Sequence, residues 1–400
     1  MMEATTESVP ESAAPAVGEL IELRVEKLIA GGEGLGRFTG VPVFVSFAAP
    51  GDQLRVRVVE RRREFARAEI VEVLSPGPGR RTPPCPVFGR CGGCDLQHLE
   101  EPVQLEWRAR AAVETLQRFS GIADLPTPEI VAGPNWGYRI RTQLQVDRSP
   151  EGRAQLGYFE RSTHTVVPIS GCPILVPELN AILPQLDETL QQNFARRVDL
   201  AAGESGLSCS PALPGLPHGE VTTTVRGHEL AFDARTFFQG HRDLVPALVE
   251  HAVGEESGDE AYDLYAGVGL FTLELARLFR RVTAIESDAY SIRYLRINAR
   301  RNKRTGIEVV GKSVDAWIRE LPHGVDRVLV DPPRSGLSLP VRRVLEDRRP
   351  RRLTYVSCHT ATLARDLREL SGAFRVRSLC LLDCFPQTGH LEVVAQLEAR

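Results

Sequence analysis

Apolar and polar residues alternate in four short runs between residues 19 and 74. The runs are ELIELRVEKL, VPVFVSF, DQLRVRVVERR and FARAEIVEVL, and the glycine- or proline-bearing stretches GGEGLGR and AAPGD separate the first three. A period of two is typical of strands with one buried face, and short strands joined by such turns close readily into a small barrel. The pattern therefore predicts a β-barrel over residues 19–75.

The pattern from residue 76 to residue 240 is mixed. It begins with the linker PGPGRRTPPCP and then changes between helical spacing and alternation. Changes of this kind indicate a central domain built from both helices and strands. The predicted elements are helices near 101–119 and 177–195, strands near 138–147 and 153–160, and a loop over 201–219.

Strand and helix patterns take turns over residues 241–400. AYDLYAG, RVTAIES, VDRVLVDPP and RLTYVSC predict strands, and VGLFTLELARLFR has apolar residues at helical spacing. This rhythm favours an α/β domain in which helices cover a mostly parallel sheet. FRVRSLCLLDCF and HLEVVAQLE predict a final pair of strands.

Composition and charge narrow the class of protein. Hydrophobic residues make up 42% and charged residues 25% of the chain, as in ordinary soluble domains, and no apolar run is long enough for a membrane span. Residues 1–18 are small, acidic and proline-bearing and lack a secretory signal's apolar core, so we expect a disordered tail and a cytoplasmic protein. The net charge of −3 argues against a nucleic-acid partner, yet arginines cluster locally. Such clusters are either solvated helix faces or phosphate-contacting patches, and charge alone leaves both open.

The segment DLYAGVG ends a predicted strand and opens a helix. Gly267 lets the backbone pass close to a ligand, and the helix N-terminus offers free N–H groups. Glu286 ends the next strand, where a carboxylate can accept both ribose hydroxyls of an adenosine. Thr272 takes the place of the third glycine of a dinucleotide fingerprint. The form is similar to that of class I S-adenosylmethionine methyltransferases, although a turn without a ligand also fits.

Asp331-Pro332-Pro333-Arg334 follows another predicted strand. The carboxyl edge of such a sheet is where ligands lie, so we expect this loop to face the cofactor and the substrate. An aromatic residue after the two prolines would suggest methylation of an exocyclic amine. Arg334 stands at that position instead, which disfavours a nucleic-acid amino-methyltransferase.

Cys358 and Glu392 form a candidate catalytic pair. Cys358 follows a strand and begins a loop into a helix, where the helix dipole is expected to lower a thiol pKa. Glu392 opens the last strand, and it meets the same edge if that strand runs antiparallel. Alone, such a cysteine is most often a small core residue and such a glutamate a surface residue.

The chemistry of uracil gives the pair a use. Carbon 5 of uracil is a poor nucleophile, but addition of a thiolate at carbon 6 makes an enolate-like species that attacks a sulfonium methyl group. A base must then remove the proton on carbon 5 before the thiolate can leave. The pair therefore predicts uracil-C5 methylation.

Three of the eight cysteines lie close together, in CPVFGRCGGC. In a reducing compartment clustered cysteines indicate a metal site rather than disulfides. Spacing alone leaves an iron–sulfur cluster and zinc equally open.

Together these motifs resemble the RNA uracil-C5 methyltransferases, in the branch that carries a TRAM domain and an iron–sulfur cluster and methylates 23S ribosomal RNA. GGEGLGRFTGVPVFVSFAAPGD is similar to a TRAM barrel, an OB-like RNA-binding module. GCPIL, PNWGYRIR, FFQG, VSCHTATLARDL and FPQTGHLEVV match the family's later motifs, so the resemblance covers nearly all of the chain from residue 19.

The resemblance implies roles for individual residues. It makes Cys358 the nucleophile and Glu392 the base, and it favours a 4Fe–4S cluster over zinc. The cluster is expected to be structural, because polar methyl transfer needs no electrons. The expected cofactor contacts are Gln239, Tyr265, Gly267, Glu286 and Asp331, and the expected cluster ligands are Cys85, Cys91, Cys94 and Cys172.

The chain also departs from the family pattern at two places. Leu270 stands where asparagine is common, which removes one expected cofactor hydrogen bond. His359-Thr360 replaces the usual Asn-Pro after the nucleophile, which is expected to change the shape of that loop.

We therefore expect a three-domain α/β enzyme. A class I S-adenosylmethionine methyltransferase domain (241–400) would follow an OB-like barrel (19–75) and a mixed α+β central domain (76–240). The expected partner is RNA, with 23S ribosomal RNA as the substrate and transfer RNA as the alternative, and we expect a monomer without a membrane partner. A non-catalytic RNA-binding protein is disfavoured because Cys358, Glu392 and Glu286 are all present.

Overall fold

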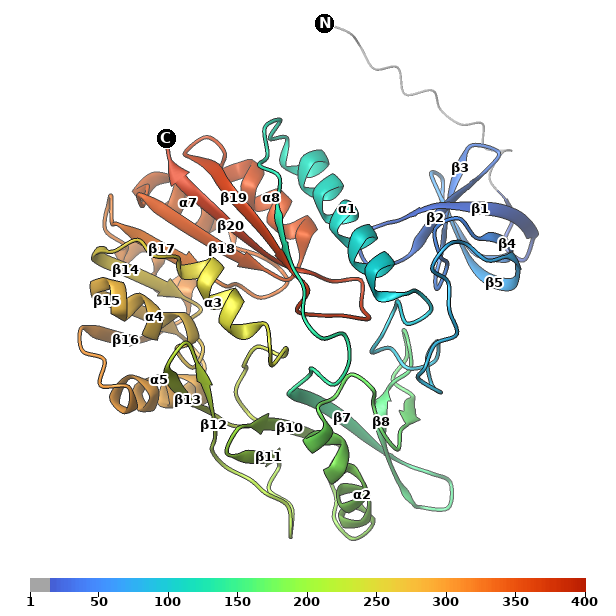
Figure 1. Cartoon of the computed structure of the whole chain (residues 1–400), viewed down its shortest axis with the longest axis horizontal. Helices are drawn as coiled ribbons and strands as arrows, with labels where there is room; N and C mark the ends of the chain where they lie inside the picture. Colours follow the sequence, from blue (N-terminus) through green and yellow to red (C-terminus); the bar gives the residue numbers. More distant parts are fainter. Residues whose placement is uncertain (1–14) are drawn as a thin grey trace, which may run out of the picture. The chain divides into compact units, whose positions relative to one another are not determined.

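The computed structural model describes residues 15–400, so most of the tail predicted over 1–18 lies outside the described residues. The chain divides into two compact units. The N-terminal unit ends at Ala111 and also contains the short segment Gln387–His390. The larger unit comprises Ala112–Pro386 and Leu391–Arg400. Figure 1 shows the ribbon, with the boundary falling inside helix α1 (Glu101–Ser120).

The N-terminal unit contains the predicted barrel. Its five strands close in the order β1-β2-β3-β5-β4, and alternate residues such as Ile21, Leu23 and Val25 point into the barrel core. The alternation seen in the sequence is therefore confirmed as one buried and one exposed face. The strands are β1 (Leu20–Leu28), β2 (Gly34–Phe38), β3 (Val41–Val45), β4 (Gln53–Arg61) and β5 (Ala66–Ser75).

The segment Gln387–His390 is hydrogen-bonded inside the N-terminal unit. The backbone N–H groups of Asp95 and Leu96 both donate to the Gln387 carbonyl, at 2.8 and 3.0 Å. The Gly389 N–H donates to the Asp95 carboxylate at 3.0 Å. A Cβ on Gly389 would lie 2.2 Å from the carbonyl carbon of Gly31, so only glycine fits at this close backbone approach.

An eight-stranded sheet forms the core of the larger unit, in the order β16-β15-β14-β17-β18-β20-β19-β6. The first five strands in that order are parallel, and β20 runs antiparallel to both β18 and β19. This confirms the predicted α/β sheet and its final pair. The strands are β14 (Gly258–Leu264), β15 (Phe279–Glu286), β16 (Ile307–Gly311), β17 (Arg327–Val330), β18 (Arg352–Ser357), β19 (Phe374–Leu382), β20 (Glu392–Ala399) and β6 (Glu129–Val131).

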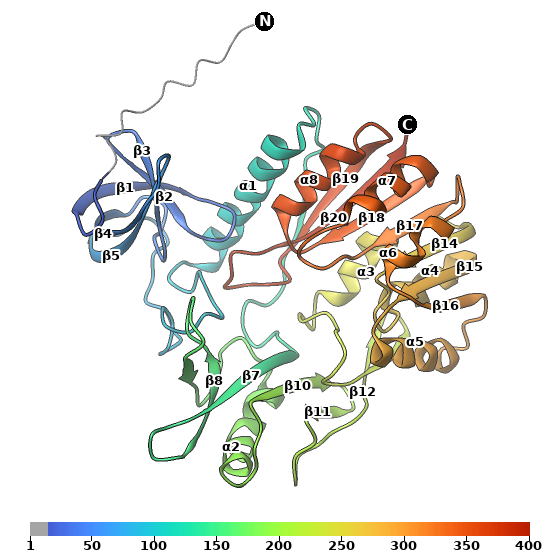
Figure 2. The ribbon, with the colours of Figure 1, turned by 180° about the vertical axis from the view of Figure 1, so that it is seen from behind.

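Helices cover both faces of this sheet. Figure 1 shows α3 on one face, and the reverse view in Figure 2 shows α7 and α8 on the other. All four residues of β17 are buried, as expected for a parallel strand covered on both sides. The helices are α3 (Val245–Val253), α4 (Leu270–Leu278), α5 (Ala289–Arg301), α6 (Val314–Trp317), α7 (Leu339–Arg348) and α8 (Thr360–Leu370), and a short 3-10 helix spans Ile318–Glu320.

A second, antiparallel sheet in the larger unit has the order β11-β10-β7-β8-β9, with helix α2 packed on it. The prediction of a loop over 201–219 is wrong for its first half. The structure has a hairpin there, in which the two residues Glu204-Ser205 connect β10 to β11. The glycines and serines of this segment are typical of turns, so the pattern did not predict the strand in which Cys209 is buried. The elements are β7 (Arg141–Arg148), β8 (Ala154–Phe159), β9 (Val166–Pro168), α2 (Pro177–Gln192), β10 (Arg197–Gly203) and β11 (Gly206–Ser210), followed by the hairpin β12 (Val221–Val225) and β13 (His228–Phe232).

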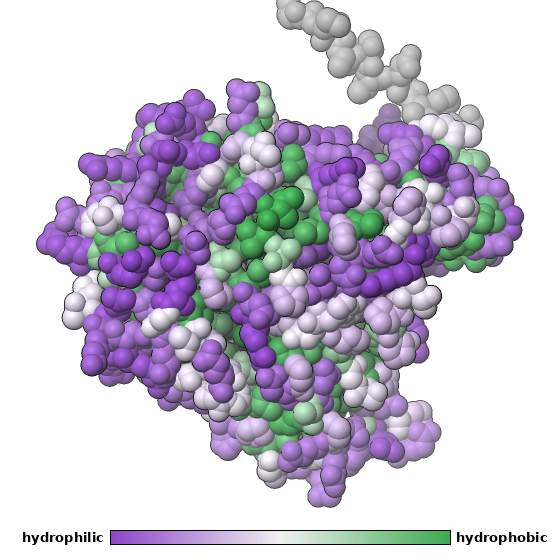
Figure 3. Space-filling model, in the orientation of Figure 1, coloured by the Kyte–Doolittle hydropathy of each residue, from purple (hydrophilic) through white to green (hydrophobic). Residues whose placement is uncertain are grey.

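The surface carries both polar and apolar residues, as expected for a chain of ordinary composition. On the face drawn in Figure 3, polar residues break the apolar surface into separate patches. Within residues 15–400 no helix is long and apolar enough to cross a membrane.

Candidate active site at the carboxyl edge of the sheet

Strand pairing brings Cys358 and Glu392 to the same place. Ser357 of β18 pairs with Val393 of β20, so one further step outward sets Cys358 opposite Glu392. This confirms that the last strand runs antiparallel and that its first residue reaches the carboxyl edge. Cys358 is half-buried at the edge, whereas Glu392 is 2% exposed.

The carboxyl group of Glu392 lies in an unusual environment. Its Oε1 atom is buried and has no hydrogen-bond partner among the described residues. Burial, and after it the negative charge of Asp331, raise the pKa of Glu392 well above its usual value. A carboxylate with a raised pKa binds a proton readily, which is the property a general base needs.

Cys358 is held as a thiol. Burial raises its pKa to about 12, and the negative charges of Glu392 and Asp331 act in the same direction. Arg334 opposes them and lowers the pKa. The expectation that the helix start gives a low thiol pKa is therefore wrong, because burial and the two carboxylates outweigh it.

The loop after β14 and the end of β15 are tied together through Glu286. The Gly267 N–H donates to Glu286 Oε2 at 2.8 Å, and the Ser287 and Asp288 N–H groups donate to Oε1 at 2.6 and 2.8 Å. Each carboxylate oxygen keeps a further lone pair for another donor. Tyr265 has a φ of 68° and Gly267 a φ of 54°, so the turn that carries both is left-handed.

Two further carboxyl groups lie behind this loop. The Thr272 hydroxyl donates to Asp263 Oδ2 at 2.5 Å, and Gln239 Nε2 donates to Asp331 Oδ2 at 3.3 Å. Burial raises the pKa of Asp263 and the pKa of Asp331 to about 7 each. The structure thus places two of the predicted cofactor residues, Gln239 and Asp331, within hydrogen-bond distance of each other. The sequence did not predict the role of Thr272, whose hydroxyl donates a hydrogen bond to the buried Asp263 carboxyl group. Leu270, the departure at the start of α4, packs in the core.

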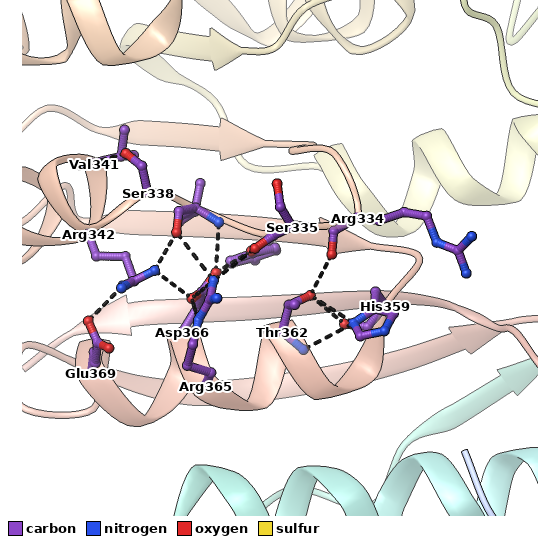
Figure 4. A network of polar contacts seen from close by, with 12 residues as sticks. Arg334, Ser335, Ser338, Val341, Arg342, His359, Thr362, Arg365, Asp366 and Glu369 are labelled. Atoms are coloured by element: carbon purple, nitrogen blue, oxygen red, sulfur yellow. Dashed lines mark hydrogen bonds and ion pairs between the residues drawn. The ribbon is translucent and has the colours of Figure 1, made fainter. Parts of the chain in front are cut away.

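A polar network connects α8 to the loop that follows Asp331 (Figure 4). Asp366 is wholly buried and accepts from Tyr355 Oη at 2.7 Å, from the Leu337 N–H at 2.8 Å and from Arg342 Nη1 at 3.0 Å. Nearer the nucleophile, the Thr362 hydroxyl donates to the Arg334 carbonyl at 3.1 Å. Thr362 and Asp366 both belong to the sequence motif TLARD. The sequence alone did not show that this motif holds the loop after Asp331, because the contacts depend on how the helix packs against that loop.

An exposed aromatic ring lies two residues before Gln239. Phe237 is 63% exposed, which is unusual for a large apolar side chain. The guanidinium carbon of Arg141, on β7, lies 5.8 Å from the ring centre, and burial lowers the pKa of Arg141 to about 10. An exposed ring beside a cation can stack a nucleic-acid base.

The four predicted cluster cysteines divide between the two units. Cys85, Cys91 and Cys94 belong to the N-terminal unit, and Cys172 belongs to the larger one. The Gly93 N–H donates to Cys91 Sγ at 3.4 Å, and Asn180 bonds both the N–H and the carbonyl of Cys172. Over residues 15–400, no three His, Cys, Asp or Glu side chains are grouped so that they could hold a metal ion.

Known proteins share both the sequence and this architecture. A family described as tRNA (Uracil-5-)-methyltransferase matches residues 222–400, and the TRAM domain matches residues 16–71. The 23S rRNA (uracil(1939)-C(5))-methyltransferase RlmD of Pectobacterium atrosepticum is 33% identical over 408 residues, which are 91% of this chain and 90% of that protein. The chain belongs to the RNA uracil-C5 methyltransferase family. An uncharacterized RNA methyltransferase of Synechocystis, sll1967, is 32% identical over 96% of both chains.

A solved structure agrees with the fold of this family member. The Pyrococcus abyssi tRNA (uracil-54, C5)-methyltransferase, crystallised with S-adenosyl-L-homocysteine, superposes with a TM-score of 0.74 and 25% identity. The match covers 94% of this chain and 99% of that one. The expected class I methyltransferase fold with an N-terminal TRAM barrel is therefore confirmed.

Proposed function

We propose that this family member transfers a methyl group from S-adenosylmethionine to carbon 5 of uracil in RNA. The observation that carries the proposal is the register that sets Cys358 opposite the buried Glu392 at the ligand-binding edge of the sheet. Cys358 acts as the nucleophile and Glu392 as the base. A nucleic-acid amino-methyltransferase has no use for this pair.

The residues around the β14 turn fit an adenosine-bearing cofactor. Glu286 is oriented by three backbone N–H groups, and Gly267 has a left-handed backbone with open space where a Cβ would lie. S-adenosylmethionine supplies an electrophilic methyl group when bound. We propose that Gln239, Tyr265, Gly267, Glu286 and Asp331 hold it.

The reaction assigns each residue a separate step. Cys358 Sγ gives its proton to water and forms a bond to carbon 6 of uracil. The electron pair of the double bond between carbons 5 and 6 moves onto carbon 5 and the adjoining carbonyl as an enolate. After carbon 5 accepts the methyl group, Glu392 takes the proton from carbon 5. The electron pair of that C–H bond re-forms the double bond to carbon 6 and expels the thiolate. Arg334 helps the first step, because its charge lowers the pKa of Cys358.

The RNA is held by other parts of the chain. The TRAM barrel over 19–75 and the central domain over 76–240 supply the RNA grip, and 241–400 supplies the chemistry. The exposed ring of Phe237, next to the half-buried Arg141, is suited to stacking a base beside the site. We propose 23S ribosomal RNA as the substrate, because the RlmD relative covers nearly the whole chain. A cytoplasmic monomer suits such a substrate.

The four predicted cysteines are proposed to hold a 4Fe–4S cluster, with zinc as the alternative. Four thiolates are a suitable ligand set, and the Gly93 N–H that reaches Cys91 Sγ is the kind of donor that stabilises a metal-bound thiolate. The role of the cluster is structural, since the proposed reaction moves no electrons.

One comparison tests the function and the substrate together. The purified protein is incubated with labelled S-adenosylmethionine and with either 23S ribosomal RNA or transfer RNA. Label should appear as 5-methyluridine in the ribosomal RNA, as identified by nucleoside mass spectrometry. Label in transfer RNA alone would show that transfer RNA, and not 23S ribosomal RNA, is the substrate. Label on an exocyclic amine, or no label at all, would overturn the proposed reaction.

A further inference from the structure

The helix that follows the nucleophile begins with an unusual cap. His359 occupies the N-cap position of α8, and its Nδ1 accepts the Thr362 N–H at 3.3 Å. Serine, threonine, aspartate and asparagine are the residues preferred at this position. Unlike any of their side chains, imidazole changes from acceptor to donor at Nδ1 when it binds a proton near neutral pH.

The cap is joined to the loop that follows Asp331. The Thr362 hydroxyl lies 3.1 Å from His359 Nδ1, and it reaches two carbonyl oxygens, that of His359 at 2.9 Å and that of Arg334 at 3.1 Å. On the other side of Cys358, the His359 N–H donates to the Ser357 hydroxyl at 3.2 Å. Figure 4 shows the contacts of Thr362 with His359 and Arg334, beside the contacts of Arg365 and Asp366. Hydrogen bonds therefore hold the residues on both sides of the nucleophile.

The charges around the ring favour its neutral form. Burial lowers the pKa of His359, and the positive charges of Arg334 and Arg365 lower it further. A protonated Nδ1 could no longer accept the Thr362 N–H, and its own hydrogen would instead point to the Thr362 hydroxyl oxygen 3.1 Å away. Because the pKa is lowered, the cap is complete at neutral pH and is lost as the pH falls through that lowered pKa, below the usual value of 6.5.

We propose that the neutral His359 ring is a positioning residue of the nucleophile loop. By capping α8 and tying that helix through Thr362 to the Arg334 carbonyl, it keeps Cys358 opposite Glu392. The inference rests on the proposed roles of Cys358 and Glu392. It adds that the loop loses its order when the ring is protonated.

Two substitutions separate the effect of the helix cap from the effect of protonating the His359 ring. His359→Ala removes the acceptor, and it should lower kcat at pH 8 about fivefold, the rate equivalent of a helix cap of about 1 kcal/mol. His359→Asn keeps an acceptor that does not titrate. It should retain kcat at pH 8 within about twofold, and its ratio of kcat at pH 5 to kcat at pH 8 should exceed that of the wild type. His323→Ala, which removes an exposed histidine elsewhere in the larger unit, is the matched control.

A second measurement does not depend on methyl transfer. Alkylation of Cys358 by iodoacetamide, followed by peptide mass spectrometry, should be faster in His359→Ala than in the wild type because the half-buried thiol loses its fixed loop. Asparagine at position 359 should restore the wild-type rate. If the proposed reaction fails in every protein, the alkylation rates still test the positioning role.

The outcomes that overturn the inference are distinct. A His359→Ala protein that binds S-adenosylhomocysteine, yet has wild-type kcat and wild-type alkylation, would show that the cap positions nothing. An asparagine variant with the wild-type pH ratio would show that protonation of the ring is irrelevant. If His359→Ala does not fold, Thr362→Val keeps the backbone N–H and removes only the hydroxyl that reaches Arg334. A wild-type kcat for that variant would also contradict the proposal.

Discussion

The Gly267 N–H donates a 2.8 Å hydrogen bond to Glu286 Oε2, and this contact joins the ends of two neighbouring parallel strands. The carboxylate therefore does two things: it closes the turn after β14, and it presents its remaining lone pairs to whatever lies above that turn. A residue with both roles should be sensitive even to an isosteric change.

Glu286→Gln should weaken binding of S-adenosylhomocysteine. The amide replaces one acceptor oxygen with a donor that faces backbone N–H groups, and the loss of a charged hydrogen bond of about 1.5–3 kcal/mol corresponds to a roughly 10- to 100-fold higher Kd. Titration calorimetry measures it. Glu308→Gln, an exposed glutamate on neighbouring β16, should bind like the wild type. Equal affinity in both variants would remove Glu286 from the cofactor site.

Cys358→Ala and Glu392→Gln should fail at different steps. Cys358→Ala cannot form a bond to RNA, so neither product nor a covalent complex is expected. Glu392→Gln can still add and methylate, but it cannot release by elimination, so a methylated protein–RNA adduct should survive denaturing electrophoresis. RNA containing 5-fluorouridine should trap the wild type in the same way, because fluorine does not leave as a proton does. Methylation by Cys358→Ala would refute the mechanism.

The pH dependence of Cys358 reactivity should follow its charged neighbours. Burial, Glu392 and Asp331 raise the pKa of this thiol to about 12, so its alkylation should still be rising at pH 10. Glu392→Gln removes one negative charge, and the pKa should therefore fall, which increases the thiolate fraction at a given pH. A fall of half a unit would give about a threefold faster alkylation at pH 9.5. An unchanged rate, with Glu308→Gln as the control, would mean that the two side chains do not interact.

The proposed cluster predicts a colour and a stoichiometry. Protein purified without oxygen should be brown and contain roughly four irons per chain. Cys91→Ser should lose the visible absorption, whereas Cys209→Ala, a buried cysteine outside the proposed set, should keep it. One zinc per chain without visible absorption would establish the alternative metal.

Some of the site followed from pattern, and some did not. The mostly parallel sheet was predictable from the alternation of strand and helix patterns. That Cys358 and Glu392 share an edge followed only on the condition that the last strand is antiparallel, which the structure meets. The 2% exposure of Glu392 was not predictable, since glutamate is usually a surface residue and its burial depends on distant packing. The thiol pKa was expected in the wrong direction for the same reason. Local position suggested a helix dipole, but burial and two carboxylates from other strands decide the result.

The tetrapeptide Gln387–His390 also sets the order in which this protein can finish folding. During synthesis the residues of the barrel and the cysteine loop leave the ribosome long before this segment exists. Until it does, the N–H groups of Asp95 and Leu96 lack the Gln387 carbonyl that satisfies them, and one hydrogen bond of the unit, from Gly389 to Asp95, spans 294 residues. Closing such a long loop is slow compared with local structure formation. The first unit to be made is therefore among the last to be completed, and a truncated chain that stops short of residue 390 leaves it unfinished.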